Sequence, residues 1–443
     1  MKNFNSICFK NNKKLSSFFI ITILLSTLIS TIKCSSFCDF CQCYDDRASS
    51  LFIENDDIDE MFHVVNCNGE QLINKNALTT SYKMQTLEWP LTEKRIIGYF
   101  NHLNLTVLPK LEHAPSNKVI VLNFDDNLIE TIGTKPFQYF ENLVEISLRN
   151  NFISDLPKDL LYGLRKLDHL NLSNNSITFV REDFIPDSLQ LKSIDLSHNS
   201  IKSLSSDIIQ GLQTVEQINL NHNEIYVIKS GGSQGKTKWR NLNLSGNKLK
   251  VLTDLSLIDF PELTKLDLSH NGLVNIERDT FVNLSLLEKL DLSANELHGV
   301  VMKLPESLDK IKLGNNSLRL WPLEHTPKNL RYLDVHGNEL TELFNGQDVV
   351  PHLKVLNISR NVIDIFPLIN FTHLSILDLS YNAFTEVPKH LPKYAPLLEE
   401  LIMDNNPLSS LKLGERMRLS KLSFKNMPFI ESIDAFTFSN VGK

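Results

Sequence analysis

Residues 261–273, PELTKLDLSHNGL, contain the pattern from which the fold can be predicted. Apolar residues stand eight, five and three places before Asn271 and two places after it, at Leu263, Leu266, Leu268 and Leu273. The same frame surrounds thirteen asparagines, which recur about every 23 residues: Asn127, Asn151, Asn175, Asn199, Asn223, Asn247, Asn271, Asn295, Asn316, Asn338, Asn361, Asn382 and Asn406. A frame that returns at a nearly fixed period predicts a chain built from stacked copies of one structural unit.

The leucine pair in each unit predicts a short β-strand, because apolar and polar residues alternate there with period two. Strands of successive units are expected to stack in parallel and to line the concave side of a curved α/β solenoid, or horseshoe. Each framework asparagine stands where the chain leaves its strand, and its amide can satisfy backbone groups of its own turn and of the neighbouring turn. Two irregular units, at 96–118 and 419–443, have Leu103 and Met427 in place of asparagine and bring the expected total to about fifteen.

The frame L-x-x-L-x-L-x-x-N-x-L is the leucine-rich repeat signature. The unit length and the phenylalanine in the second half of many units, as at Phe137, Phe184 and Phe281, resemble the animal extracellular leucine-rich repeat proteins. That group includes the Slit, chaoptin-like and Toll-receptor ectodomains. The resemblance covers about nine-tenths of the chain after its first residues, and it implies a rigid scaffold that binds other proteins.

The first 34 residues have the features of a secretory signal peptide. Four lysines precede residue 15 without any acidic residue, and an apolar run over 15–32 is followed by small polar residues. The run is slightly longer than usual, so an uncleaved membrane anchor is the alternative. No other stretch of the sequence is long and apolar enough to span a bilayer. We therefore expect an exported protein, either secreted or at the cell surface.

Four of the six cysteines remain after the signal peptide, at Cys38, Cys41, Cys43 and Cys67. An even cluster in an exported chain indicates two disulfides, and a four-cysteine zinc site is the alternative. The resemblance implies the pairs Cys38–Cys43 and Cys41–Cys67. It also implies that residues 35–95 form an N-terminal cap, with an edge strand over 63–68.

Within the cap, residues 44–66 are expected to form a long acidic loop. A calcium site is the alternative there, but the loop has no glycine at the sharp-turn position and no terminal glutamate at the right distance. The solenoid then occupies residues 96–443. The family usually closes its solenoid with a second cysteine-rich cap, which this sequence does not contain. We expect the chain to be a fragment of a longer ectodomain, attached to a membrane only through an anchor beyond these 443 residues.

Composition argues against several other functions. The formal net charge of −7 disfavours a nucleic-acid binder. The glycine-rich segment 230–238 has Ser230 where a phosphate-binding loop needs glycine, so no nucleotide cofactor is expected. His198, His222 and His270 recur before framework asparagines; a metal site is the alternative to exposed polar positions. No nucleophile, base and acid form a recognisable arrangement, so we expect no enzyme and no cofactor.

Eight Asn-x-Ser/Thr sequons are candidate glycosylation sites in an exported chain: Asn104, Asn171, Asn174, Asn243, Asn283, Asn315, Asn357 and Asn370. Three of them, Asn171, Asn243 and Asn357, lie between strand leucines and are expected on the concave side. Carbohydrate at these three positions would obstruct binding nearby.

Basic and aromatic residues gather on four successive concave units, and these residue types are typical of protein interfaces. The candidate binding residues are Lys310, Lys312, Arg331, Tyr332, His336, Lys354, Arg360 and Tyr381. We therefore predict an adhesion or receptor-type ectodomain whose concave face recognises another extracellular protein. A secreted structural matrix protein is the alternative, and the sequence leaves open whether the chain forms a homodimer.

Overall fold

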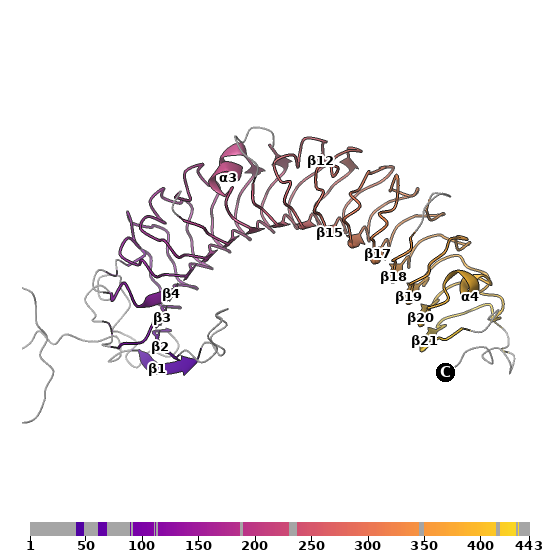
Figure 1. The fold of residues 1–443 in the computed structure, drawn as a ribbon, viewed down its shortest axis with the longest axis horizontal. Helices are drawn as coiled ribbons and strands as arrows, with labels where there is room; N and C mark the ends of the chain where they lie inside the picture. The colour runs from indigo at the N-terminus through magenta and orange to yellow at the C-terminus, as the bar shows by residue number, and fades with distance from the viewer. Residues whose placement is uncertain are drawn as a thin grey trace, which may run out of the picture.

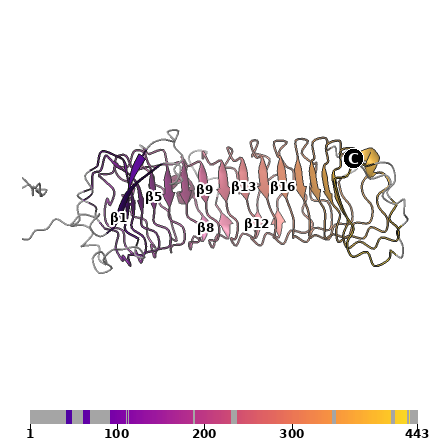
Figure 2. The ribbon, with the colours of Figure 1, turned by 90° about the horizontal axis from the view of Figure 1, so that it is seen from below.

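The computed structural model describes residues 41–47, 61–68, 89, 92–109, 111, 114–186, 189–229, 237–344, 350–412, 417–430 and 433. These residues form an arc, and a continuous β-sheet lines its concave side (Figure 1). Figure 2 shows the strands of this sheet side by side along the arc. The predicted solenoid with a parallel concave sheet is therefore confirmed.

The concave sheet has 17 strands and follows the order of the chain. It starts with β1 (Gln42–Arg47), which is antiparallel to β2 (Met61–Asn66), and every later strand is parallel to the one before it. The strands after the hairpin are β3 (Ile96–Tyr99), β4 (Val119–Asn123), β5 (Glu145–Ser147), β6 (His169–Asn171), β7 (Ser193–Asp195), β9 (Gln217–Asn219), β11 (Asn241–Asn243), β13 (Lys265–Asp267), β15 (Lys289–Asp291), β16 (Lys310–Lys312), β17 (Tyr332–Asp334), β18 (Val355–Asn357), β19 (Ile376–Asp378), β20 (Glu400–Ile402) and β21 (Lys421–Ser423). Thirteen framework-asparagine turns, with one atypical unit at each end, account for the strands from β3 to β21.

The remaining elements are short and lie away from the concave strands (Figure 1). Two parallel pairs form there, β8 (Ser203–Leu204) with β10 (Val227–Ile228), and β12 (Val251–Leu252) with β14 (Asn275–Ile276). The helices of the described residues are α3 (Ser206–Gly211) and α4 (Leu391–Tyr394). The Ser205 side chain accepts a hydrogen bond from the Ile208 backbone N–H and so caps α3 at its N-terminus.

The framework leucines form one core that runs the length of the arc. In β13, Leu266 is 2% exposed, whereas Lys265 on its N-terminal side is exposed to solvent. The convex half of the core contains Phe137, Phe184 and Phe281, none more than 2% exposed. Burial of each such side chain contributes about 1.5–3 kcal/mol, and it requires neighbouring units because no single unit can enclose its own leucines.

The N-terminal cap differs from the prediction of a long loop and an edge strand over 63–68. Residues 42–47 and 61–66 pair as a hairpin, and β1, not the second strand, lies at the sheet edge. Phe62, Val64 and Val65 of β2 are all fully buried, so apolar side chains on both faces of this strand stabilise it. The antiparallel strand β1 covers the edge of β2 that would otherwise present unpaired backbone groups.

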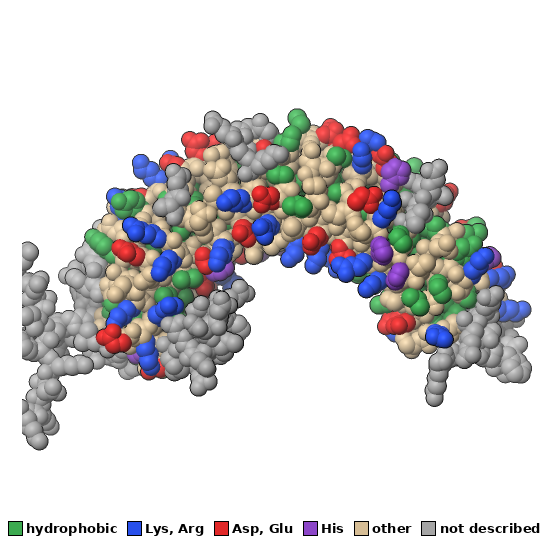
Figure 3. Space-filling view, in the orientation of Figure 1, with side chains coloured by type: hydrophobic (Ala, Val, Ile, Leu, Met, Phe, Trp, Pro, Cys, Tyr) green, Lys and Arg blue, Asp and Glu red, His purple; other side chains and the backbone are tan. Residues whose placement is uncertain are grey.

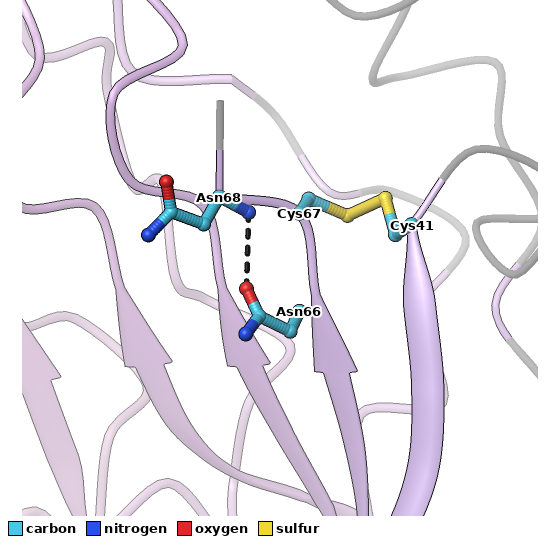
Figure 4. Close-up of a disulfide and its surroundings, with 4 residues drawn as sticks. All are labelled: Cys41, Asn66, Cys67 and Asn68. Carbon is cyan, nitrogen blue, oxygen red and sulfur yellow. Dashed lines mark hydrogen bonds between the residues drawn. A yellow bond between two sulfur atoms is a disulfide. The ribbon is translucent and has the colours of Figure 1, made fainter. Parts of the chain in front are cut away.

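A disulfide between Cys41 and Cys67 joins the start of β1 to the residue after β2 (Figure 4). Beside it, the Asn66 side chain accepts a hydrogen bond from the Asn68 backbone N–H at 3.0 Å. Cys43 is also disulfide-bonded, and its expected partner Cys38 lies outside the described residues.

Several sequence predictions lie outside the part of the chain that the structure describes. These are the signal peptide at 1–34, the acidic residues at 48–60, the glycine-rich residues 230–236 and the end of the chain from 434 onwards. Within the described ranges, no helix combines the length and the apolar character that crossing a membrane requires.

Candidate protein-binding face

The framework asparagines connect each coil to the coil before it. The Oδ1 atom of Asn199 accepts a hydrogen bond from the Ile177 backbone N–H at 2.8 Å. Its Nδ2 atom donates to the carbonyl oxygens of Leu172 in the preceding coil and Leu196 in its own, both at 3.0 Å. The same bonds occur at all thirteen positions: Asn127, Asn151, Asn175, Asn199, Asn223, Asn247, Asn271, Asn295, Asn316, Asn338, Asn361, Asn382 and Asn406.

The residue directly before each framework asparagine has a left-handed backbone. Its φ angle ranges from 50° at His222 to 67° at Gly246. Asn, Asp, His and Gly adopt this conformation more readily than other residues, which explains why histidines recur there. The rings of His198 and His222 stack with centroids 4.5 Å apart, but Gly246 occupies the unit between His222 and His270. Among the described residues no three His, Cys, Asp or Glu side chains are grouped to hold a metal ion.

Four places before each framework asparagine lies a second column of residues, and ten of its thirteen members serve the turn at the strand end. In the unit of Asn271, the Oδ1 atom of Asp267 accepts hydrogen bonds from the backbone N–H and the hydroxyl of Ser269, at 2.9 and 2.7 Å. Asn and Asp accept the same backbone bond throughout this turn column, at Asn123, Asn171, Asp195, Asn219, Asn243, Asp267, Asp291, Asp334, Asn357 and Asp378. The Asn and Asp residues of the turn column therefore have a structural role.

A third column of residues stands six places before each framework asparagine, and its side chains make no hydrogen bond that recurs from unit to unit. We call it the open column, and the strand register aligns its members from β5 to β21: Glu145, His169, Ser193, Gln217, Asn241, Lys265, Lys289, Lys310, Tyr332, Val355, Ile376, Glu400 and Lys421. Three successive lysines are followed by three successive apolar or aromatic residues. Lys265, Lys289, Val355 and Ile376 were not among the predicted binding residues. Each of these four residues directly precedes the central leucine of its strand, and aligning the repeats at that leucine would have identified them as neighbours.

The structure spreads the eight predicted binding residues across the full width of the concave face. Lys310 and Tyr332 stand in the open column, where the Lys310 ammonium lies 4.1 Å from the centre of the Tyr332 ring. Arg360 and Tyr381 occupy left-handed positions at the edge where the strands end, and the guanidinium lies 4.4 Å from the Tyr381 ring centre. The predicted patch therefore separates into groups at different edges of the sheet.

Three of these residues pair with acidic neighbours. The Lys312 ammonium lies 2.6 Å from Asp291, Arg331 forms an ion pair with Asp309, and His336 Nδ1 lies 2.7 Å from Asp334. The Lys312 hydrogen bond, with those from Ser293, outweighs burial and holds the pKa of Asp291 below its ordinary value. The same bond raises the pKa of Lys312.

Arg331 and Lys354 lie at the opposite edge, where the strands begin. They line a shallow hollow of about 600 Å³, together with Glu288, Ser307, Asp309, Asn329, His352 and His373. Figure 3 shows basic and histidine side chains together on this inner edge of the arc, in its C-terminal half. Acidic residues line the hollow at one end and basic residues at the other, so it has no single charge.

The sequons fall into two structural groups. Five asparagines are exposed: Asn104, Asn174, Asn283, Asn315 and Asn370. The other three belong to the turn column and are half-buried, and each accepts a hydrogen bond from the serine hydroxyl of its own sequon: Asn171 from Ser173, Asn243 from Ser245, and Asn357 from Ser359.

The repeat geometry agrees with a family comparison. A profile described as "Leucine rich repeat" matches residues 117–177, 189–249 and 261–318, and a second profile of the same description matches residues 166–190. The chain contains leucine-rich repeats over these residues. The oligodendrocyte-myelin glycoproteins of Mus musculus and Homo sapiens are each 33% identical to it over 93 residues. That segment covers 20% of this chain and 21% of each relative, so the chain spans about a fifth of their length.

Several solved structures have the same fold. A chain of the Toll–Spatzle complex of Drosophila is 19% identical with a TM-score of 0.58, over 78% of this chain and 49% of that one. The LRIM1/APL1C complex gives 20% identity and a TM-score of 0.54, over 79% and 63%. A leucine-rich repeat protein of Leptospira interrogans gives 24% and 0.54, over 75% and 91%. At these identities the likeness shows the fold alone.

Proposed function

We propose that this leucine-rich repeat protein is an adhesion or receptor-type ectodomain that recognises another extracellular protein through its concave face. Its mechanism is rigid display of side chains, without catalysis. The observation that carries the proposal is the open column, whose side chains leave a firmly held sheet without a repeated structural role. Two of the similar solved structures are complexes with another protein, which is a precedent for this use of the fold.

Rigidity favours binding because little conformational entropy is lost when the partner arrives. Each strand of the concave sheet is paired on both sides from β2 to β20. The thirteen framework asparagines, which we call the asparagine ladder, add side-chain hydrogen bonds between successive coils where the strands end. Side chains on such a sheet are held close to one arrangement before any partner binds.

Three observations support an extracellular location. The first 34 residues predict a signal peptide, the Cys41–Cys67 disulfide is typical of an oxidising compartment, and five sequon asparagines are exposed. The matched relatives are named as glycoproteins. We infer that the chain is exported and that residues 35–95 cap the solenoid of residues 96–443.

The proposal can be tested by adding carbohydrate to the concave face. The double substitution Gln217→Asn with Asn219→Ser creates a sequon in the open column, and serine also occupies the turn column at Ser147. The full chain, secreted from animal cells, would be screened against a panel of extracellular domains. Binding of any partner should fall at least tenfold when the added site is occupied.

The matched control places carbohydrate away from the concave strands. Glu277→Thr completes a sequon at Asn275, an exposed residue of β14. A partner that binds both glycosylated variants equally well would show that recognition does not use the concave face. A partner that loses only the concave variant supports the proposal.

A further inference from the structure

Three lysines of the open column are stacked on adjacent strands. Lys265 pairs in register with Lys289, and Lys289 pairs with Lys310. Neighbouring strands are about 4.8 Å apart, and like charges directly opposite one another destabilise a sheet. Elsewhere the chain places a carboxylate one coil away from a lysine, as in the Lys192–Asp168 and Lys248–Glu224 pairs. The lysine stack is therefore a departure from the chain's own pattern.

The positive charge of this stack is open to an outside group. Lys265 and Lys289 are both exposed, and neither forms an ion pair with any carboxylate of the described residues. The neighbouring carboxylates of the turn column accept hydrogen bonds from other residues. Asp267 accepts two from Ser269, and Asp291 accepts hydrogen bonds from Ser293 and Lys312.

The open column then continues with apolar side chains. Tyr332, Val355 and Ile376 follow Lys310 in register on β17, β18 and β19, and all three are partly exposed. Apolar side chains at the centre of a concave sheet gain free energy when a partner removes them from water, at about 25 cal/mol per Å². The six residues span five strand steps, or about 24 Å, which equals an extended polypeptide of about seven residues.

We propose that this column binds a polypeptide segment in which carboxylate side chains are followed by aliphatic or aromatic ones. The carboxylates contact Lys265, Lys289 and Lys310, and the apolar side chains contact Tyr332, Val355 and Ile376. This inference rests on the proposed function and specifies the chemistry of the partner. A nucleic acid or a sulfated glycan would satisfy the lysines but would leave the apolar half without a counterpart.

The test uses a displayed library of random 16-residue peptides, selected on the full chain at low salt. Selected peptides are then measured against a variant with Lys265→Gln, Lys289→Gln and Lys310→Gln, and against Val355→Asp. The control variant carries Lys158→Gln, Lys166→Gln and Lys202→Gln, three exposed lysines outside the column. The substitutions remove repulsion between stacked lysines and also the contact of Lys310 with the Tyr332 ring, so the thermal unfolding of the column variant is measured beside that of the parent chain. Equal melting temperatures with lost binding show that the loss does not arise from unfolding.

We expect selected peptides to contain at least two carboxylates followed within a few residues by an aliphatic or aromatic residue. Their affinity should fall at least tenfold with the column variant and with Val355→Asp, and should be unchanged with the control. Peptides without carboxylates, equal binding to the column variant, or no selected peptide at all would overturn the inference. A heparin oligosaccharide that binds the column and is indifferent to Val355→Asp would overturn it too. A protein partner blocked by concave carbohydrate but indifferent to the lysine substitutions would leave the proposed function standing and reject this inference alone.

Discussion

The side-chain oxygen of Asn199 accepts a hydrogen bond from the backbone N–H of Ile177, 22 residues earlier in the chain, with 2.8 Å between oxygen and nitrogen. Because the same amide donates to carbonyl groups on both coils, one buried side chain satisfies backbone groups of two successive units. No apolar residue can replace it without leaving these groups unpaired.

Asn199→Ala should lower the free energy of unfolding by about 1–3 kcal/mol, since it leaves buried backbone groups without partners. The measurement is the urea midpoint followed by circular dichroism. Asn275→Ala is the matched control, because Asn275 is exposed on β14 and should change the midpoint little. Equal effects of the two substitutions would contradict a stabilising role for the ladder.

The left-handed position before each framework asparagine predicts opposite effects for two substitutions. Ala294→Gly removes a conformational penalty of about 1–2 kcal/mol and adds about 0.5–1 kcal/mol of glycine flexibility, so a small gain in stability is expected. Gly246→Ala should be destabilising, because φ is +67° and the new Cβ would lie 2.6 Å from Nδ1 of His222. Gly133→Ala is the control, since no atom lies within 4 Å of a Cβ built there. Thermal melting compares the three.

The Lys312–Asp291 pair predicts a dependence of stability on pH. The pKa of Asp291 lies below its ordinary value of 3.8, so its contribution is present above about pH 4 and is lost as the pH falls through the lowered pKa. The pKa of Lys312 is raised above its ordinary value of 10.5. The pair therefore still contributes to stability at pH 10.5, and this contribution is lost as the pH rises through the raised pKa. Because Lys312 is partly exposed, the contribution at neutral pH should be below about 1 kcal/mol.

Lys312→Met should therefore lower the urea midpoint at pH 6, and the difference from the parent chain should shrink towards pH 3. Lys289→Gln is the control, because Lys289 forms no ion pair within the described residues and the substitution should introduce no such pH dependence. A difference for Lys312→Met that stays constant from pH 6 to pH 3 would show that the ion pair contributes nothing.

Side-chain exposure predicts which sequons carry carbohydrate in the secreted chain. We expect glycans at the exposed residues Asn104, Asn174, Asn283, Asn315 and Asn370. We expect none at Asn171, Asn243 and Asn357, which are half-buried between neighbouring strands and bonded to their own sequon serines. Mass spectrometry of glycopeptides checks this directly. Carbohydrate on the three concave asparagines would also argue against partner binding beside them.

The framework residues could be predicted from sequence because each unit repeats the same local constraint. The equivalents of Asn271 and Leu266 in the other coils have the same kinds of neighbours. A pattern that occurs thirteen times therefore predicts their burial and hydrogen bonding. The cap was predicted less well. Tyr44 belongs to a strand and not to a loop, because the hairpin forms by pairing with β2, which single-sequence periodicity does not reveal.

The candidate binding face was only partly predictable. Arg331 and Arg360 were grouped because both were expected on successive concave units, yet one lies where the strands begin and the other where they end. Lys265 and Lys289 were not predicted as binding residues, although they stand in the same column as Lys310. Which outward residues serve a turn and which remain available depends on hydrogen bonds between residues two apart, such as Ser269 with Asp267.

The stacked-coil fold follows from the amino-acid pattern alone, because the leucines and asparagines have roles that the adjacent coil satisfies. Which side chains stand together on the concave face depends on how the coils stack in the folded chain. Residues 24 positions apart become neighbours about 4.8 Å apart through strand register, so the partners of Lys289 are set by coil stacking and not by nearness along the chain.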